Sequence, residues 1–190
     1  MFDKLIQLKV DGIASSQREE MFVMVMSEVQ GPRCMPIAIG LLEANTVLAF
    51  REKINWPRPL PHHLIAGVAG AFEIEIKRVV IDYYDKGVYT AKIEFVRDGI
   101  IALVDSRTSD AVALALLSNC PIYATVEVFE KVALPSKPGR YVSLRKEAEP
   151  LSEATDEALH FALRSAIERE DYEQAADIKK EINRRNTNNN

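Results

Sequence analysis

The chain has 190 residues, of which 47% are hydrophobic and 27% are charged, and its 24 basic and 28 acidic residues give a net charge of −4. This composition is that of an ordinary globular protein, and it excludes a disordered chain, a collagen-like chain and a disulfide scaffold. Because the net charge is small, no global field attracts nucleic acid or anionic lipid, and a role on nucleic acid requires a local patch.

The first two thirds of the chain mix strand and helix patterns. Runs of β-branched and other apolar residues predict strands at 5–13, 21–29, 35–40, 74–84, 89–95, 100–105 and 123–132. Helical periodicity predicts helices at 41–54, 62–71 and 111–117, the last apolar on all sides and therefore buried. Asp85-Lys86-Gly87 suits a three-residue hairpin loop, and Asp98-Gly99 suits a two-residue turn. Strands and helices are grouped, which predicts an α+β fold with a mixed, mostly antiparallel sheet.

The last third of the chain is more polar, and its pattern is helical. Pro135 to Arg140 interrupts the apolar pattern, and a polar stretch follows. Ser152 can cap a helix, and Asp171, with Gln174 behind it, can cap a second, which predicts a C-terminal αα-hairpin. We therefore expect a main domain at residues 1–135, a linker at 136–151, the hairpin at 152–186 and a disordered tail at 187–190.

One candidate site lies between the strand at 100–105 and the helix that follows it. The strand delivers Asp105 to its end, the loop carries Arg107, and Asp110 stands in the first turn of a helix that Thr108 or Ser109 can cap. A helix N-terminus beside a guanidinium can bind a phosphate, and the two carboxylates can bind a hard cation such as Mg²⁺ or Mn²⁺. The alternative is structural: Asp105 starts a turn, Asp110 complements the helix dipole and Arg107 is solvated.

A second candidate group combines Glu43, Arg58 and His62. Glu43 stands in the first turn of a predicted helix, Arg58 lies between two prolines, and His62 follows Pro61 at a helix start. A histidine can act as a general base or contact phosphate, although a capping or surface histidine is the plainer alternative. We expect His63 to be a solvated neighbour.

Several motifs, in order and with matching spacing, resemble the bifunctional nuclease domain of bacteria and plants. The segments that carry the resemblance are Met35-Pro36-Ile37-Ala38-Ile39-Gly40 with Glu43-Ala44, Pro57-Arg58-Pro59-Leu60 with His62, Val79-Val80-Ile81, Tyr89 with Ala91, Val104-Asp105-Ser106-Arg107 with Ser109-Asp110-Ala111, and Pro121-Ile122-Tyr123. The resemblance covers residues 3–135.

The resemblance implies cleavage of DNA and RNA by metal-assisted phosphodiester hydrolysis. Carried over by position, it points to Glu43, Arg58, His62, Asp105, Arg107 and Asp110. In this interpretation Asp105, Asp110 and Glu43 hold Mg²⁺ or Mn²⁺, His62 positions or deprotonates water, and the two arginines neutralise phosphate charge. The family pattern has an aspartate after the histidine, where this chain has His63.

The C-terminal segment resembles the UVR motif, a short module of excision-repair nuclease subunits and some stress regulators. The matching residues are Leu163, Ala166, Ile167, Glu170-Asp171-Tyr172-Glu173, Ala175-Ala176, Ile178-Lys179 and Ile182. The resemblance implies contact with a protein partner rather than catalysis, whereas an ordinary hairpin packed on its own domain is the alternative.

Two hypotheses follow. In the first, the chain is a cytoplasmic nuclease that acts on DNA, RNA or both without contacting a membrane, and its hairpin at 152–186 binds a protein partner. In the second, the chain is a non-catalytic regulator or scaffold, in which the hairpin recruits a partner and the main domain forms a homo-oligomer. The small net charge favours the second, because nucleic-acid binders usually carry a basic face.

Overall fold

A computed structural model describes residues 2, 4–15, 21–54, 56, 58–136, 141–142, 151, 154–168 and 170–188. Its strands are β1 (Leu5–Ser15), β2 (Met21–Glu28), β3 (Arg33–Gly40), β4 (Glu75–Asp85), β5 (Val88–Arg97), β6 (Ile100–Arg107), β7 (Ile122–Thr125) and β8 (Leu134–Pro135). Its helices are α1 (Leu41–Arg51), α2 (Pro61–Ala71), α3 (Thr108–Ser118), α4 (Val126–Val132), α5 (Asp156–Glu168) and α6 (Tyr172–Asn188).

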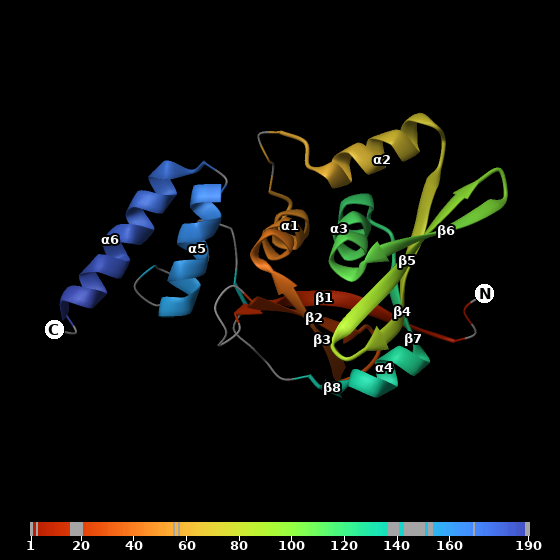
Figure 1. Ribbon diagram of the computed structural model, residues 1–190, viewed down its shortest axis with the longest axis horizontal. Helices are drawn as coiled ribbons and strands as arrows, with labels where there is room; N and C mark the ends of the chain where they lie inside the picture. The colour runs from red at the N-terminus through yellow and green to blue at the C-terminus, as the bar shows by residue number, and fades with distance from the viewer. Residues whose placement is uncertain are drawn as a thin grey trace.

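The strands of the described part of the chain form one sheet in the order β6-β5-β4-β7-β1-β2-β3-β8. β4 pairs with β7 in parallel, and the other neighbours pair antiparallel. In Figure 1, α1 and α3 lie together on one side of β1–β3, and α4 lies on the other side. The predicted α+β class, with a mostly antiparallel mixed sheet and a C-terminal helical pair, is confirmed.

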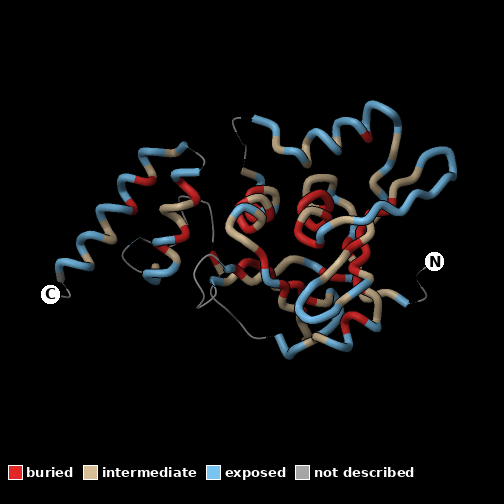
Figure 2. The backbone as a smooth tube through the Cα atoms, viewed as in Figure 1, coloured by how far each residue is buried: buried red, intermediate tan, exposed pale blue. Residues whose placement is uncertain are grey.

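The main core forms where α1 and α3 pack against the middle of the sheet. Its fully buried members include Ile13 and Met24 on the strands and Leu48 on α1. Residues 111–115 of α3 are all buried, and this helix appears in Figure 2 as a mainly red turn inside the fold. The all-round apolar pattern of α3 therefore predicted its burial correctly.

Two hairpin turns of the same kind join β4 to β5 and β5 to β6. Asp98 and Gly99 have φ of 50° and 77°, as expected for a two-residue turn that needs positive φ at both positions. Lys86 and Gly87 have φ of 47° and 91°, and Asp85 pairs with Val88 as the last rung of the ladder. The first turn therefore has two residues, and the predicted three-residue loop is wrong.

The predicted strand at 123–132 is confirmed only as far as Thr125, and its remaining part is wrong. The strand β7 ends at Thr125, whose Oγ1 accepts a hydrogen bond from the Val128 backbone N–H at 3.3 Å and so caps α4. The β-branched residues of this segment favour a strand, but the cap and an ion pair between Glu127 and Lys131, one turn apart, stabilise a helix instead.

The C-terminal helices form an αα-hairpin with a small core of its own. Asp171 caps α6 as predicted, because its Oδ1 accepts from the Gln174 backbone N–H at 3.1 Å. Thr155 caps α5, accepting from the Ala158 N–H at 3.2 Å, whereas the predicted cap Ser152 lies outside the described residues. Helix α6 continues to Asn188, two residues into the segment predicted as a tail.

The hairpin packs against the main domain through one aromatic contact and one polar contact. The Phe161 ring of α5 meets Phe22 of β2 edge-on, with 4.6 Å between centroids, and it is buried within the main core. Nearby, Asn45 of α1 donates a hydrogen bond from Nδ2 to Oε2 of Glu168 at 2.7 Å. The end of α5 therefore contacts the helix that carries Glu43.

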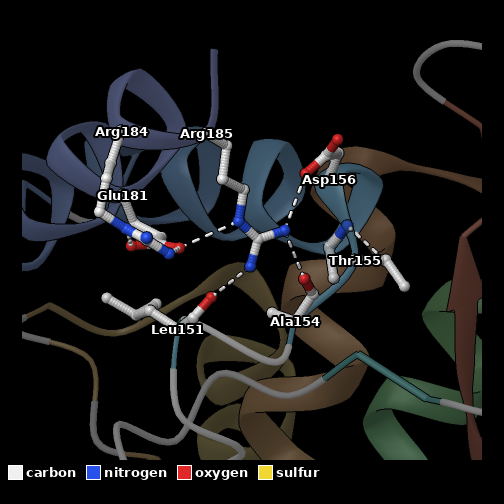
Figure 3. A network of polar contacts seen from close by, with 8 residues as sticks. Leu151, Ala154, Thr155, Asp156, Glu181, Arg184 and Arg185 are labelled. Carbon is white, nitrogen blue, oxygen red and sulfur yellow. Dashed lines mark hydrogen bonds and ion pairs between the residues drawn. The ribbon is translucent and has the colours of Figure 1, made fainter. Parts of the chain in front are cut away.

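A guanidinium near the end of α6 holds the two ends of the hairpin together (Figure 3). Arg185 donates to the backbone oxygens of Leu151 at 2.7 Å and Ala154 at 2.8 Å, and to Oδ1 of Asp156 at 2.8 Å. It also donates to Glu181, and Arg184 pairs with the same carboxylate. These arginines lower the pKa of Glu181 to about 2.

We expect Arg185→Ala to loosen the C-terminal half of α6, because three of the hydrogen bonds of this side chain tie α6 to α5 and to the segment before α5. Amide hydrogen exchange in residues 181–188 should be faster than in the wild type. Arg184→Ala is the matched control, since the only contacts described for Arg184 are to Glu181. Equal exchange in the two variants would contradict the clamping role.

The lowered pKa of Glu181 also predicts a pH dependence. Below pH 4.5 its carboxylate protonates progressively, and its contribution to the free energy of unfolding of the wild type should be lost.

Among the described residues, no helix combines the length and apolar character needed to cross a bilayer.

Candidate functional site

Three helices begin around one pocket of about 620 Å³. Its walls come from the first turns of α1, α2 and α3 and from the end of β6. The first-turn N–H groups of each helix carry partial positive charge, which favours acidic side chains and anions there. The pocket is lined by Glu43, His62, Arg107 and Asp110, four of the six residues predicted from the sequence.

Arg107 connects the two carboxylates of the pocket. Its Nε and Nη2 donate to the two oxygens of Asp110 at 2.7 and 3.1 Å, and its Nη1 donates to Oε1 of Glu43 at 2.9 Å. These partners, Asp110 first, raise the pKa of Arg107 above its ordinary value. The side chain is nevertheless 69% exposed, so a ligand can reach the guanidinium from solvent.

Glu43 occupies the first turn of α1, directly after β3. Its Oε2 lies 2.7 Å from the position that a Cβ on Gly40 would take. A side chain at Gly40 would therefore displace this carboxylate from its place beside Arg107, which explains why glycine suits the residue that precedes α1.

His62 faces Asp110 from the start of α2. Its Nε2 lies 3.5 Å from Oδ1 of Asp110, and its ring packs edge-on against Phe50 with 5.6 Å between centroids. Nδ1 is buried and has no hydrogen-bond partner within the described part of the chain. Burial lowers the pKa of His62 below 6.5, although Asp110 opposes the shift. The imidazole is therefore neutral at pH 7, as a general base must be.

The lowered pKa of His62 predicts the acid side of the pH profile of any reaction that uses this ring as a base. The logarithm of kcat/KM should fall only below pH 6.5, and this limb should be absent in His62→Gln. The stability of the folded chain should depend on pH in the same range. The unfolded chain binds a proton on this residue more readily than the folded chain, so the free energy of unfolding should decrease as the pH falls below 6.5. A limb centred above 6.5 would contradict the assignment.

Asp105 lies away from the pocket. It forms an ion pair with Lys92, its cross-strand partner on β5, and its side chain is 71% exposed. Successive residues of a strand point to opposite faces, and Ser106 is the one that lines the pocket. The structure therefore does not bring Asp105 to Asp110.

Arg58 and His63 also lie outside the pocket lining. Arg58 is exposed in the connector before α2. His63 has a structural contact: its Nδ1 accepts a hydrogen bond from the Leu60 backbone N–H at 3.1 Å, and its ring packs on Phe50. An aspartate at position 63 could accept the same hydrogen bond. The histidine found here, where the resembled family has aspartate, therefore still caps the helix.

The start of α3 differs from the sequence prediction. The helix begins at Thr108, with Arg107 as its N-cap and no side-chain capping bond, so the predicted cap by Thr108 or Ser109 is wrong. Both residues lie within the first turn, where Ser109 lines the pocket and the Oγ1 of Thr108 is buried without a partner among the described residues. The residue pattern suggested only a capping role for Ser109 and gave no signal that it lines the pocket.

The side chains present do not form a ready site for a divalent cation. Within the described ranges, no group of three or more His, Cys, Asp or Glu side chains is arranged to hold a metal ion. The guanidinium of Arg107 occupies the space between Glu43 and Asp110, the two carboxylates that a cation would share. As arranged, Arg107 rather than a metal ion offsets the charge of the two carboxylates.

Comparison with known proteins agrees with the motifs. A family model described as "Bifunctional nuclease domain" matches residues 24–137. Two proteins of Mycobacterium tuberculosis, the uncharacterized proteins MT1877 (strain CDC 1551 / Oshkosh) and Rv1829 (strain ATCC 25618 / H37Rv), are each 33% identical over 128 residues. These matches cover 67% of this chain and 76% of each relative.

Proposed function

The chain belongs to the bifunctional nuclease domain family, and we propose that it hydrolyses phosphodiester bonds of DNA, RNA or both at the pocket where α1, α2 and α3 begin. One observation carries the proposal: Glu43, His62, Arg107 and Asp110, from segments far apart in sequence, line that single pocket.

In this proposal Arg107 binds the phosphate. A guanidinium has more N–H donors than the three bonds to Glu43 and Asp110 use, and its planar fork matches the geometry of phosphate oxygens. The unpaired N–H groups at the start of α3 add to the attraction. Asp110 and Glu43 are positioning residues, because they hold the guanidinium at the mouth of the pocket.

His62 supplies the proton transfer. Its neutral ring can take a proton from an attacking water molecule while the adjacent carboxylate of Asp110 stabilises the imidazolium that forms. General base catalysis of this kind contributes about 100- to 10,000-fold to a rate. The phosphorus–oxygen bond to the leaving group breaks as the new bond to water forms, and the leaving oxygen takes up a proton from solvent.

A cleavage assay tests the proposal. Labelled single- and double-stranded DNA and RNA are incubated with the full chain in the presence of Mg²⁺, Mn²⁺ or EDTA. We expect product in at least one arm and a loss of about 100-fold or more in His62→Gln. Glu127→Gln, an exposed carboxylate on α4, is the matched control. No cleavage of any substrate, or equal cleavage by wild type and His62→Gln, would overturn the proposal.

A second candidate function is the non-catalytic scaffold, and the charge of the site favours it. Two carboxylates and one guanidinium leave the pocket with one negative charge when His62 is neutral, which repels a phosphate backbone. In this alternative the hairpin, interpreted as a UVR module, binds a protein partner. Among the described residues of the hairpin, the most exposed large hydrophobic side chains are Ile167 and Tyr172, beside the turn between α5 and α6.

Paired variants separate the two functions. If the hairpin recruits a partner, Ile167→Lys with Tyr172→Lys should abolish its capture by the full chain, while His62→Gln should leave capture intact. If the chain is only a nuclease, neither variant changes capture and only His62→Gln changes cleavage. The alternative fails if the chain cleaves nucleic acid and captures the same proteins with and without the hairpin substitutions.

A further inference from the structure

Helix α2 is apolar, yet it lies on the outside of the molecule. Its sequence after the two histidines is Leu64-Ile65-Ala66-Gly67-Val68-Ala69-Gly70-Ala71. Of these residues, Ala69 is buried. Leu64 is 67% exposed, and Ile65 and Val68 are each nearly half exposed. Figure 2 shows α2 as a largely pale blue turn above the core. One face of α2 packs against α3 and β4, but a helix that is apolar on all sides is normally covered on its other faces as well.

Strand β6 is exposed in the same region. It forms one edge of the sheet, and its residues from Ile100 to Asp105 are all exposed. Ile100, Ala102 and Val104 point toward α2, whereas Ile101 and Leu103 point to the other face. The strand therefore presents apolar side chains on both faces and, along its outer edge, backbone groups that pair with no strand of the described chain.

The two edges of the sheet differ in how far they are protected from pairing with another strand. The opposite edge, β8, has two residues, and one of them is Pro135, which cannot donate a backbone hydrogen bond. β6 has eight residues, and it contains no proline. Proteins usually protect a long edge strand with charges, proline or a covering element, so an unprotected apolar edge indicates a pairing site.

A groove of about 850 Å³ joins the two exposed elements. It runs between α2 and the β5–β6 hairpin, and Leu64, Val68, Phe95, Ile100 and Val104 line it. The large apolar residues on α2 and on both faces of β6 together expose roughly 700 Å², which is close to the ~800 Å² that each partner buries in a stable interface.

We propose that a second copy of this chain covers this surface, with the two β6 strands pairing antiparallel about a two-fold axis. About a two-fold axis the same surface of both copies meets, so the β6 edge of each copy can pair with the β6 edge of the other. A register centred on Ala102 places Ile100 beside the second copy's Val104 and Ile101 beside its Leu103, so that the paired residues are all apolar. The α2 helix of each copy then contributes the remaining apolar surface.

The charges near the ends of β6 do not oppose this pairing. Arg97 pairs with Asp98 and Asp105 pairs with Lys92, so these side chains already have partners of opposite charge within their own chain.

The mass of the full chain in solution tests the proposal. Light scattering coupled to size exclusion should give twice 21.3 kDa for the wild type. Ile100→Lys with Leu103→Lys should give 21.3 kDa with a circular-dichroism spectrum like that of the wild type, because both side chains are exposed and the fold of each copy should survive the change. The matched control is Leu134→Lys on β8, the protected edge, which should remain dimeric. A monomeric wild type, or a dimer that survives the β6 substitutions, would overturn the proposal.

A cysteine at the two-fold axis tests the register. In antiparallel pairing, opposed residues lie about 5 Å apart, which a disulfide can bridge, whereas diagonal residues lie about 7–8 Å apart. Oxidation should therefore cross-link Ala102→Cys into a dimer on a non-reducing gel but should leave Ile101→Cys and the wild type uncross-linked. Cross-linking of Ile101→Cys in place of Ala102→Cys would overturn the register.

Discussion

Replacing Arg107 with alanine is expected to lower kcat/KM for phosphodiester cleavage by roughly 100- to 1,000-fold, the effect of removing one charge-stabilising donor from an active site. The variant also leaves Glu43 and Asp110 without the guanidinium that both contact, so the pocket becomes more negative and repels phosphate further. The side chain is mostly exposed, and therefore the fold should survive the change.

Arg107→Lys refines this prediction. Lysine keeps the positive charge but cannot form the paired bonds to Asp110, and it should recover only a small part of the lost activity. Steady-state kinetics on the preferred substrate measures both variants, and Arg184→Ala on α6 is the control for loss of an exposed arginine. Full activity in Arg107→Ala would remove the phosphate-binding role.

Replacing Phe161 with alanine should detach the hairpin from the main domain. The ring is buried within the main core and contacts Phe22, and truncation of a buried phenylalanine costs about 3–5 kcal/mol. For a chain of this size, a loss of that magnitude lowers the melting temperature by roughly 10 °C. Undocking also breaks the hydrogen bond between Glu168 and Asn45.

Calorimetry of Phe161→Ala beside Tyr172→Ala tests the docking. Tyr172 is an exposed aromatic residue of the same hairpin, so its removal should change the melting temperature little. Similar small shifts in both variants would show that the hairpin is held by other contacts. Because Asn45 and Glu43 share α1, cleavage by Phe161→Ala also reports whether docking supports the site.

Much of the fold could be predicted because local and global preferences agree in it. Alternating strands, the Asp98-Gly99 turn and the all-apolar α3 follow directly from periodicity and turn chemistry. The segment that forms α4 was not predictable in this way. Its β-branched residues favour a strand, and the cap by Thr125 becomes visible only when the end of β7 is known.

The arrangement of the candidate site was predictable in part. Helix starts attract acidic residues, so Glu43 and Asp110 could be placed at helix N-termini, and Pro61 placed His62 at a third. The face of Asp105 could not be deduced. Strand β6 is apolar on both faces, and its pattern does not distinguish the side that meets the helices from the side that meets Lys92.

The most direct test of the account compares two carboxylates that lie five positions apart. Asp110→Asn weakens the hold on Arg107 and His62, and it should lower kcat/KM for nucleic-acid cleavage by about 100-fold. Asp105→Asn changes a side chain that is paired with Lys92 away from the pocket, and kcat/KM should stay near the wild-type value. A large loss in Asp105→Asn with little change in Asp110→Asn would contradict the site described here.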